Sequence, residues 1–293
     1  MYKIKKIILS RKGFDSSLGR SPSPIFPDGS ICSLPIPSRD GFDKQSYQMI
    51  NYNNTDLGRI VSELTNNKVK SSCITHFDTD LRFDALKRAG NWLPLFGQVD
   101  AAQTHLENQN VESGDLFLFF GWFRETHYIN GRLKFKKDSR DLHVIFGWLQ
   151  IGEILKPTKN KKNIPVWAKY HPHVEGAIHR GLNNTLYIAS KDLKIPSLNK
   201  QIPGGGVFNK FRKELCLTSE KATTRSYWEL PGWFYPEVRN STLSYHSNIK
   251  RWSTNGSTTF LNSVARGQEF VLDCSDYPES IDWAKNLVRN NIR

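Results

Sequence analysis

The sequence predicts an α+β (mixed α/β) fold in which one large domain spans residues 1–293. Two long apolar runs, at 114–125 and 142–155, are rich enough in aromatic and branched residues to form strands buried on both faces. Amphipathic helices are indicated in both halves of the chain, and no repeat or low-complexity linker divides it. With 293 residues, 38% of them hydrophobic, the chain can bury a sizeable core.

The first half of the chain contains an opening strand and a capped helix. The run KIKKIILS at 3–10 favours a strand because branched apolar residues dominate its end. Asp56 precedes apolar residues at helical spacing in 57–64, so it is expected to cap a helix. Residues 72–82, SCITHFDTDLR, are expected to form a strand that runs into a polar turn.

The second half alternates strands with turns and ends on a helix. Asn130-Gly131 lies between the two apolar strands and indicates a hairpin turn. A further strand is expected at 184–190. Three glycines open residues 204–215, where a helical segment is expected whose start would suit an anion. An amphipathic helix is expected within 274–290.

Charge points to an anionic partner. The chain has 41 Lys and Arg residues against 28 Asp and Glu residues, which gives a net charge of +13. Because the excess is spread along the chain and not confined to a tail, a nucleotide or DNA is the expected partner.

Hydropathy and cysteine usage favour a cytoplasmic protein. No apolar run has the length of a membrane helix or of a signal-peptide core, so no membrane association is expected. The cysteines are far apart and lack metal-binding spacing, which predicts reduced, buried thiols. They are Cys32, Cys73, Cys216 and Cys274.

Residues 10–37 follow the first strand with glycine, serine, proline and scattered charges. An ordinary connection needs only about 2–6 residues, so the stretch is a disordered arm, an ordered structural loop or part of a site. Amides near its glycines could cradle a phosphate, although neither GxGxxG nor GxxxxGK[ST] is present. Its candidate site residues are Arg11, Asp15, Ser16 and Asp28.

Polar side chains alternate along residues 75–82, THFDTDLR. On a strand they would all project from one face. Such a face is costly unless its groups are solvated, paired, or gathered around a cation or substrate. The four side chains are His76, Asp78, Asp80 and Arg82.

Three interpretations of this segment remain open. The spacing of His76 and Asp78 is that used with a later histidine by iron oxygenases of the facial-triad type. Alternatively, Asp78 and Asp80 bind Mg²⁺ or act as acid and base on a phosphate ester or glycosidic bond. In the structural alternative, Asp80 pairs with Arg82 in a solvated turn. The later histidines available as a third ligand are His143, His171, His173 and His179.

Residues 170–180, YHPHVEGAIHR, form a second polar segment. His171 and His173 could hold a metal or stack on and bond to a base, and Arg180 could bind phosphate. Pro172 favours a loop here, and no HExxH motif is present. A structural or surface role is the alternative.

Aromatic residues interleave with cations in 226–237 and 249–253. Trp228 and Trp252, beside cations such as Arg225, suit stacking on bases together with phosphate contact. Burial of these rings in an aromatic core is the alternative.

The strands at 112–190 resemble the core of PUA-like, ASCH and EVE domains. The resemblance rests on the Gly-Asp pair in GDLFLFF and on FGWLQIGEI. Such domains seat a base or a modified base in the mouth of a barrel, so the resemblance implies a partly barrel-like, PUA-like sheet core.

The order of motifs along nearly the whole chain resembles the third of the nucleotide-modification-associated domain families. The motifs are IILSRKGFDSSLGRSPSPIFPDGSICSLPIP, THFDTDLR, GDLFLFFGWFR, HVIFGWLQIGEI, HPHV with NTLYIAS, and GGGVF with WELPGWF. Such domains are inferred to work in bacterial and phage systems that modify DNA bases. The resemblance implies a role in nucleotide or DNA modification, in a phage or defence setting, and makes the opening loop a wall of the site.

These patterns predict a protein that acts on nucleotides or DNA bases, with Mg or Fe as candidate cofactor. The carboxylates expected to serve in acid–base catalysis or cation binding are Asp15, Asp78 and Asp80. The expected phosphate ligands are Arg11, Arg82 and Arg180. The side chains expected to bond the base or a proton in transit, with His76 among the catalytic residues, are His76, His171 and His173.

The three polar segments are expected to converge on one cleft. The alternative to an enzyme is a non-catalytic reader that captures a modified base in an aromatic pocket. Carboxylates in the site favour the enzyme, because they repel phosphate unless they are used.

Overall fold

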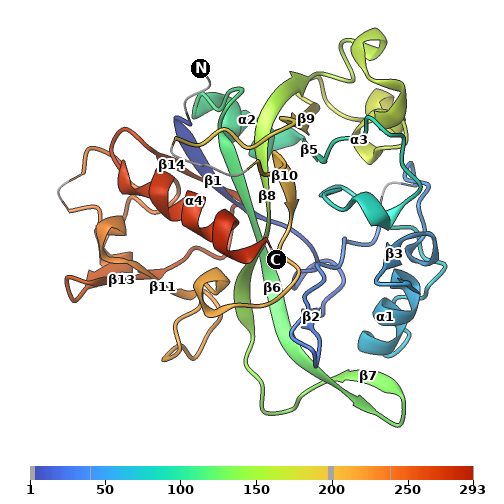
Figure 1. The fold of residues 1–293 in the computed structure, drawn as a ribbon, viewed down its shortest axis with the longest axis horizontal. Helices are drawn as coiled ribbons and strands as arrows, with labels where there is room; N and C mark the ends of the chain where they lie inside the picture. The colour runs from blue at the N-terminus through green and yellow to red at the C-terminus, as the bar shows by residue number, and fades with distance from the viewer. Residues whose placement is uncertain (1–3, 40, 197–200, 238, 293) are drawn as a thin grey trace.

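A nine-stranded sheet forms the centre of the computed structural model, which describes residues 4–39, 41–196, 201–237 and 239–292 (Figure 1). Its main path contains, in spatial order, β14 (Glu269–Asp273), β1 (Lys6–Arg11), β6 (Leu116–Ile129), β8 (Leu142–Leu155), β9 (Thr185–Ala189) and β5 (Leu95–Gln98). The shorter strands at its sides are β2 (Ser23–Ile25) and β7 (Arg132–Phe135), paired with β6, and β10 (Gly205–Val207), paired with β8. Strands β1 and β2 run parallel to β6, and the other pairs are antiparallel.

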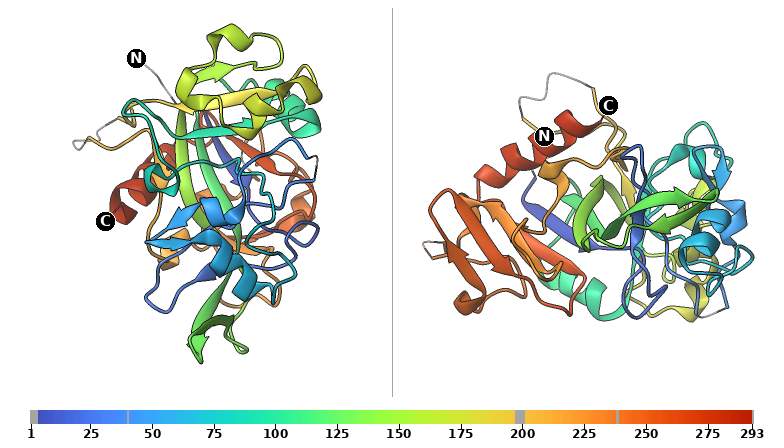
Figure 2. Two further views of the ribbon diagram at one scale, coloured as in Figure 1. Left: turned by 90° about the vertical axis from the view of Figure 1, so that its right-hand side faces the viewer. Right: turned by 90° about the horizontal axis from the view of Figure 1, so that it is seen from below.

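Smaller elements flank the central sheet on two sides. The helices are α1 (Leu57–Leu64), α2 (Asp100–Asn108), α3 (Pro172–Glu175) and α4 (Glu279–Asn291). The two small sheets consist of β11 (Tyr227–Pro231), β13 (Thr258–Asn262) and β12 (Trp252–Thr254), and of β3 (Asn51–Tyr52) and β4 (Thr55–Asp56). The sheet of β11 and β13 lies with α4 on one side of the central strands, and α1 and α3 lie on the other (Figures 1 and 2).

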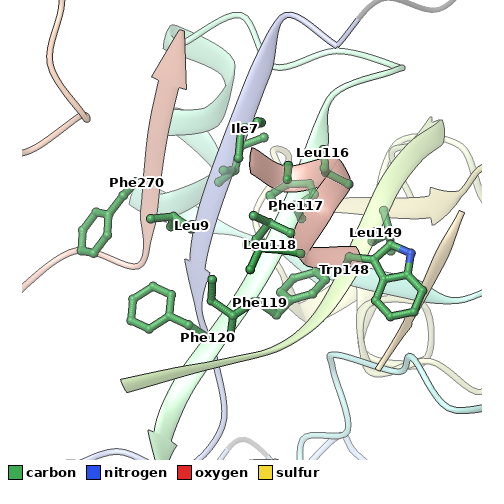
Figure 3. Close-up of a cluster of buried hydrophobic side chains, with 14 of the residues drawn as sticks. Ile7, Leu9, Leu116, Phe117, Leu118, Phe119, Phe120, Trp148, Leu149 and Phe270 are labelled. Carbon is green, nitrogen blue, oxygen red and sulfur yellow. The ribbon is translucent and has the colours of Figure 1, made fainter. Parts of the chain in front are cut away.

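The core is built on β6 and β8. Residues 116–120 of β6 have no exposed surface, which confirms that this strand is buried on both faces (Figure 3). Phe96 of β5 packs edge-on against Phe117 and Phe119, with ring centroids 5.2 and 5.3 Å away. Each fully buried side chain of this size contributes about 1.5–3 kcal/mol.

The central sheet stays open along one seam. Within the described residues, its end strands β14 and β5 share no backbone pairing. They meet through side chains, since Gln98 Nε2 donates to Glu269 Oε1 at 2.6 Å. Lys12 Nζ lies 2.8 Å from the same oxygen and 4.4 Å from the centroid of the Phe96 ring. The PUA-like barrel expected within 112–190 is therefore not confirmed, whereas the mixed α/β class is.

Local signals placed several elements correctly. Asp56 caps α1 by accepting a hydrogen bond from Arg59 N at 2.8 Å. Asn130 and Gly131 have φ angles of 50° and 74°, which form the turn between β6 and β7. The opening strand, both long strands, the strand at 184–190 and the last helix are also confirmed.

Two expected elements are absent. Residues 72–82 form isolated bridges instead of a strand. The stretch 204–215 forms β10 and a 3-10 turn at Lys213–Leu215 instead of a helix. A Cβ on Gly206 would lie 2.8 Å from the Trp148 ring, so this glycine permits close strand packing and does not open an anion site.

No helix among the described residues has the length and apolar character needed to cross a membrane; α4, the longest, has 13 residues. All four cysteines are unpaired; Cys32 and Cys274 are buried as expected, whereas Cys73 and Cys216 are only half-buried. Burial raises the pKa of Cys32 to about 12.

Candidate functional site

Residues 76–80 form an extended ribbon beside the sheet. The amide of Asp78 donates to the carbonyl of His76 at 2.9 Å, and the amide of Asp80 donates to that of Asp78 at 2.9 Å. Each bond spans two residues, as in γ-turns. The ribbon keeps the two-residue alternation of a strand, because Phe77 and Leu81 are buried in hydrophobic clusters on the opposite side. The expected polar face thus forms without a strand.

His76, Asp78 and His173 lie together, and we call them the His-Asp cluster. Each offers one ligand-type atom, and the three atoms lie within 4.8 Å of one another. His173 Nε2 is 3.7 Å from Asp78 Oδ1, and the ring centroids of His76 and His173 are 5.4 Å apart. His173 belongs to α3, which packs on β5 (Figure 1). The fold therefore joins two motifs that are nearly a hundred residues apart.

Both imidazoles of the cluster have a partner at Nδ1. His76 Nδ1 lies 3.0 Å from Asp43 Oδ2, and His173 Nδ1 lies 2.7 Å from Asn184 Oδ1. Burial lowers the pKa of His173 well below its ordinary value. Burial opposes ionisation of Asp43, but the nearby His76 holds the pKa of that carboxyl below its usual range.

The backbone around Asp78 is fixed by its neighbours. Gly97 N donates to Asp78 Oδ1 at 2.6 Å, and His171 Nε2 donates to the Asp78 carbonyl at 2.9 Å. His171 Nδ1 accepts from the amide of His173 at 3.3 Å. Burial lowers the pKa of His171 to about 3, so it is a neutral side chain that positions Asp78. Burial raises the pKa of Asp78, partly opposed by the charges of His76 and Lys12.

Asp80 belongs to a separate buried network. It pairs with Arg88 and accepts a hydrogen bond from the Tyr170 hydroxyl. Trp92 Nε1 donates to the same hydroxyl at 2.8 Å, and the Arg88 guanidinium lies 4.4 Å from the Trp92 ring. Burial raises the pKa of Asp80 to about 6 although Arg88 acts against it. These contacts indicate that the Asp80 carboxylate stabilises the folded structure.

The arginines of the two polar segments have carboxylate partners. Arg82 pairs with Asp84 at 2.6 Å, and Asp80 pairs with Arg88, so the structural alternative that paired Arg82 with Asp80 is wrong. Arg180 Nη2 lies 3.5 Å from Asp43 Oδ1.

The opening loop borders a cavity of about 660 Å³, which we call the arginine cavity. Its cationic lining residues are Arg11, Lys12, Arg124, Arg140 and Arg225. The acidic lining residues are Asp15 and Asp141, and Ser16 also lines the cavity. Five positive charges against two negative charges suit an anionic ligand.

Several donors at this cavity are unused. The Arg225 guanidinium lies 4.2 Å from the Trp122 ring and makes no hydrogen bond or ion pair with a described residue. Arg11 donates to the carbonyls of Ala265 and Val264 at 2.6 and 2.9 Å, but its buried Nε has no acceptor among the residues that the structure describes. In the same part of the chain, buried Trp122 Nε1 also finds no acceptor.

Lys12 links the arginine cavity electrostatically to the His-Asp cluster, although no member of the cluster lines that cavity. It lines the cavity, and its charge acts on the carboxylate of Asp78. The opening segment also reaches the ribbon directly, because His76 N donates to the Ile36 carbonyl at 2.8 Å. The three polar segments are therefore neighbours.

The remaining predicted residues lie elsewhere or have local roles. The Asp15 carboxylate accepts from the amides of Ser17 and Leu18 at 2.7 and 2.6 Å, which orders its own loop. Asp28 is mostly exposed and pairs with Lys210 at 2.8 Å. Trp228 and Trp252 are 0% and 6% exposed in the main core, so neither ring offers a face to a base.

A second cavity, of about 810 Å³, has the opposite charge. Its acidic lining residues are Glu125, Asp138, Glu214, Glu220 and Glu229. They outnumber its two basic residues, Arg140 and Lys213. Phosphate would be repelled there, so the arginine cavity is the better nucleotide site.

Sequence patterns did not reveal the residues that support the site. Asp43 and Arg88 stand in no motif, and Asn184 opens the NTLYIAS strand without having been singled out; only the fold brings them beside His76, Asp80 and His173.

Comparison with known proteins identifies a family. Residues 6–273 match the family described as nucleotide modification associated domain 3. No curated protein and no solved structure matches the chain.

Proposed function

Because the chain belongs to the nucleotide modification associated domain 3 family, we propose that it is an enzyme that modifies a nucleotide or a DNA base. The substrate's phosphate binds in the arginine cavity, and the reacting group lies toward the His-Asp cluster. The observation that carries this proposal is the set of five cationic side chains around one cavity, with the Arg225 guanidinium unpaired among the described residues.

Electrostatics supports phosphate as the ligand. A guanidinium binds phosphate oxygens through strong charge-assisted hydrogen bonds. Arg225 carries such donors without a carboxylate partner among the described residues, unlike Arg124, which pairs with Asp141 at 2.7 Å. An incoming phosphate would supply the missing acceptors.

The His-Asp cluster supports an enzyme over a reader. Asp78 is a half-buried carboxylate on which the charge of Lys12, a lining residue of the arginine cavity, acts, and a pure binding site for an anion gains nothing from it. A reader needs an aromatic pocket for the base, and the two tryptophans predicted to stack on a base, Trp228 and Trp252, are both buried in the core.

Binding measurements test the phosphate site. Arg225→Met should weaken binding of DNA or mononucleotides about 10–100-fold, because a hydrogen bond to a charged group contributes about 1.5–3 kcal/mol. It should also reduce the log–log salt slope by about 0.9 on duplex DNA or about 0.7 on a single strand. Lys68→Ala, an exposed lysine outside the cavity, is the control and should change neither. Absence of binding by the wild-type chain at low salt contradicts the proposal.

The proposed modifying activity is tested by expressing the protein in a bacterial host, which supplies the co-substrates. Host DNA and the nucleotide pool are analysed by mass spectrometry after expression of the wild-type chain or of Asp78→Asn. A new nucleoside that requires Asp78 supports an enzyme. Identical profiles for wild type and empty vector, together with intact DNA binding, favour the reader.

A further inference from the structure

The His-Asp cluster has the composition of a transition-metal site, and its three ligand-type atoms lie within 4.8 Å of one another. Two imidazoles and one carboxylate on three corners of a site leave further coordination positions open, an arrangement typical of non-haem Fe(II). We infer that His76, Asp78 and His173 bind one divalent first-row transition metal ion, with Fe(II) the best match. The inference adds a metal to the site of the proposed function, but it stands on geometry and needs no nucleotide.

The contacts of His76 leave one nitrogen available. Asp43 Oδ2 lies 3.0 Å from His76 Nδ1, and Arg180 Nη2 lies 3.5 Å from the other oxygen of Asp43. An ionised carboxylate only accepts hydrogen bonds, so His76 Nδ1 carries a proton toward Asp43, and Nε2 is the nitrogen that can bind a metal once it is deprotonated. This carboxylate–histidine contact is the usual support of a metal-bound imidazole.

His173 is oriented in the same way. Asn184 Nδ2 donates to the His173 carbonyl at 2.8 Å and to Thr158 Oγ1 at 3.2 Å, which identifies the nitrogen of this amide. Asn184 Oδ1, 2.7 Å from His173 Nδ1, is therefore an acceptor. His173 consequently has its proton on Nδ1 and its lone pair on Nε2, 3.7 Å from Asp78 Oδ1.

Within the described residues no hydrogen bond joins these three groups to one another, although Gly97 N donates to Asp78 Oδ1 at 2.6 Å. Neither His76 Nε2 nor His173 Nε2 makes a hydrogen bond with a described residue. When both imidazoles are neutral, their lone pairs and the carboxylate repel one another in a poorly solvated site unless a cation lies between them. The side chains of His76 and Asp78 are 15% and 14% exposed, so an ion can reach them.

The other candidate histidines lie outside the His-Asp cluster, and two of them have ring nitrogens that are already hydrogen-bonded. Both nitrogens of His171 are used, by the Asp78 carbonyl and the His173 amide. His143 Nδ1 accepts from Trp228 Nε1 at 2.9 Å in the core. The His179 ring stacks on Phe42 at 3.6 Å.

Strand β5 accommodates the His173 ring because residue 97 of this strand is a glycine. A Cβ on Gly97 would lie 2.2 Å from Cδ2 and Cγ of His173. The missing side chain lets the imidazole lie against the backbone of β5 while the Gly97 amide binds Asp78. Glycine at this place therefore serves the position of two of the three ligands.

Metal binding by the full chain tests the inference directly. Purified protein is stripped with a chelator and titrated with Co(II), Zn(II) or, without oxygen, Fe(II), with Mg²⁺ as the comparison ion. Calorimetry and elemental analysis give affinity and stoichiometry, and Co(II) absorption reports nitrogen ligands. We expect one transition ion per chain and far weaker binding of Mg²⁺, which prefers oxygen ligands.

Variants identify the ligands. His76→Ala and Asp78→Asn should each weaken binding more than about 100-fold, since losing even an outer partner of a ligand costs about 10–100-fold. His179→Ala is the matched control and should bind as wild type. Circular dichroism establishes that each variant is folded, and either folded ligand variant suffices for the test. Failure of the wild-type chain to bind a transition ion, or binding unchanged in a folded ligand variant, overturns the inference. Nucleotide binding measured separately shows whether the proposed function survives that result.

Discussion

Replacing Arg88 with methionine should lower the stability of the folded protein, because it breaks the buried ion pair between Arg88 and Asp80. The side chains of Arg88 and Asp80 are 1% and 0% exposed, and they form an ion pair. Methionine keeps an apolar stem against Trp92, whose ring lies 4.4 Å from the guanidinium, but it removes the charge. Asp80 then remains buried without its cation.

The size of the loss follows from this burial. Removing one partner of a buried ion pair costs about 3–5 kcal/mol. Tyr170 continues to donate a hydrogen bond to Asp80, which places the loss near the lower end, about 3 kcal/mol. At about 2–4 °C per kcal/mol for a large domain, the melting temperature should fall by about 6–12 °C.

A double-mutant cycle measures the pair itself. Urea unfolding at pH 8 is compared for wild type, Arg88→Met, Asp80→Asn and the double variant. Because the double variant has no unpaired buried charge, it should be more stable than the sum of the single losses predicts, by about 2–3 kcal/mol. A loss below about 1 kcal/mol for Arg88→Met, or additive losses, would refute the structural role assigned to Asp80.

Three further measurements test other parts of the structure. Gly97→Ala should displace the His173 ring, because the added Cβ would lie 2.2 Å from it; a melting temperature and a metal affinity equal to those of wild type would contradict this. Burial lowers the pKa of His246 to about 4, so between pH 6.5 and 4 the unfolded chain binds a proton that the folded chain does not, and stability falls on acidification. Urea unfolding at pH 6.5 and at pH 5 measures how much unfolding free energy is lost on acidification. In His246→Asn this loss should be smaller than in wild type by about 2 kcal/mol. An equal loss in both proteins would contradict the burial of His246 in its neutral form. Burial raises the pKa of Cys216 and Cys274 to about 11, so native protein treated with iodoacetamide at pH 7.5 should show both unmodified by mass spectrometry; rapid labelling would show that they are accessible.

Local chemistry explains which elements were predictable. The cap at Asp56 and the turn at Asn130-Gly131 depend on residues within a few positions of one another, and both form as expected. The polar face of residues 76–80 was also predictable, because a ribbon of two-residue turns and a strand share the same alternation. The backbone hydrogen bonds of such a ribbon and of a strand differ, but in both conformations successive side chains point to opposite sides.

Tertiary contacts explain what was not predictable. Spacing alone left four histidines as the third member of the cluster, and the choice of His173 depends on how α3 packs on β5. Asp43 and Asn184 carry no local signal, since each acquires its role only when the chain brings it to an imidazole nitrogen. The glycines at 204–206 suggested a helix start because composition does not reveal that Trp148 lies over Gly206.

The open seam of the sheet explains why the site forms at β5. This strand pairs with β9 along one edge only, so its other edge presents free backbone groups. Asp80 satisfies two of them by exchanging backbone hydrogen bonds with Leu95 at 3.0 Å, and the Asp78 carboxylate takes the Gly97 amide. In a closed barrel a neighbouring strand would occupy this edge, and the carboxylate would lose its anchor. The gap in the sheet and the position of the buried carboxylates are therefore one structural feature.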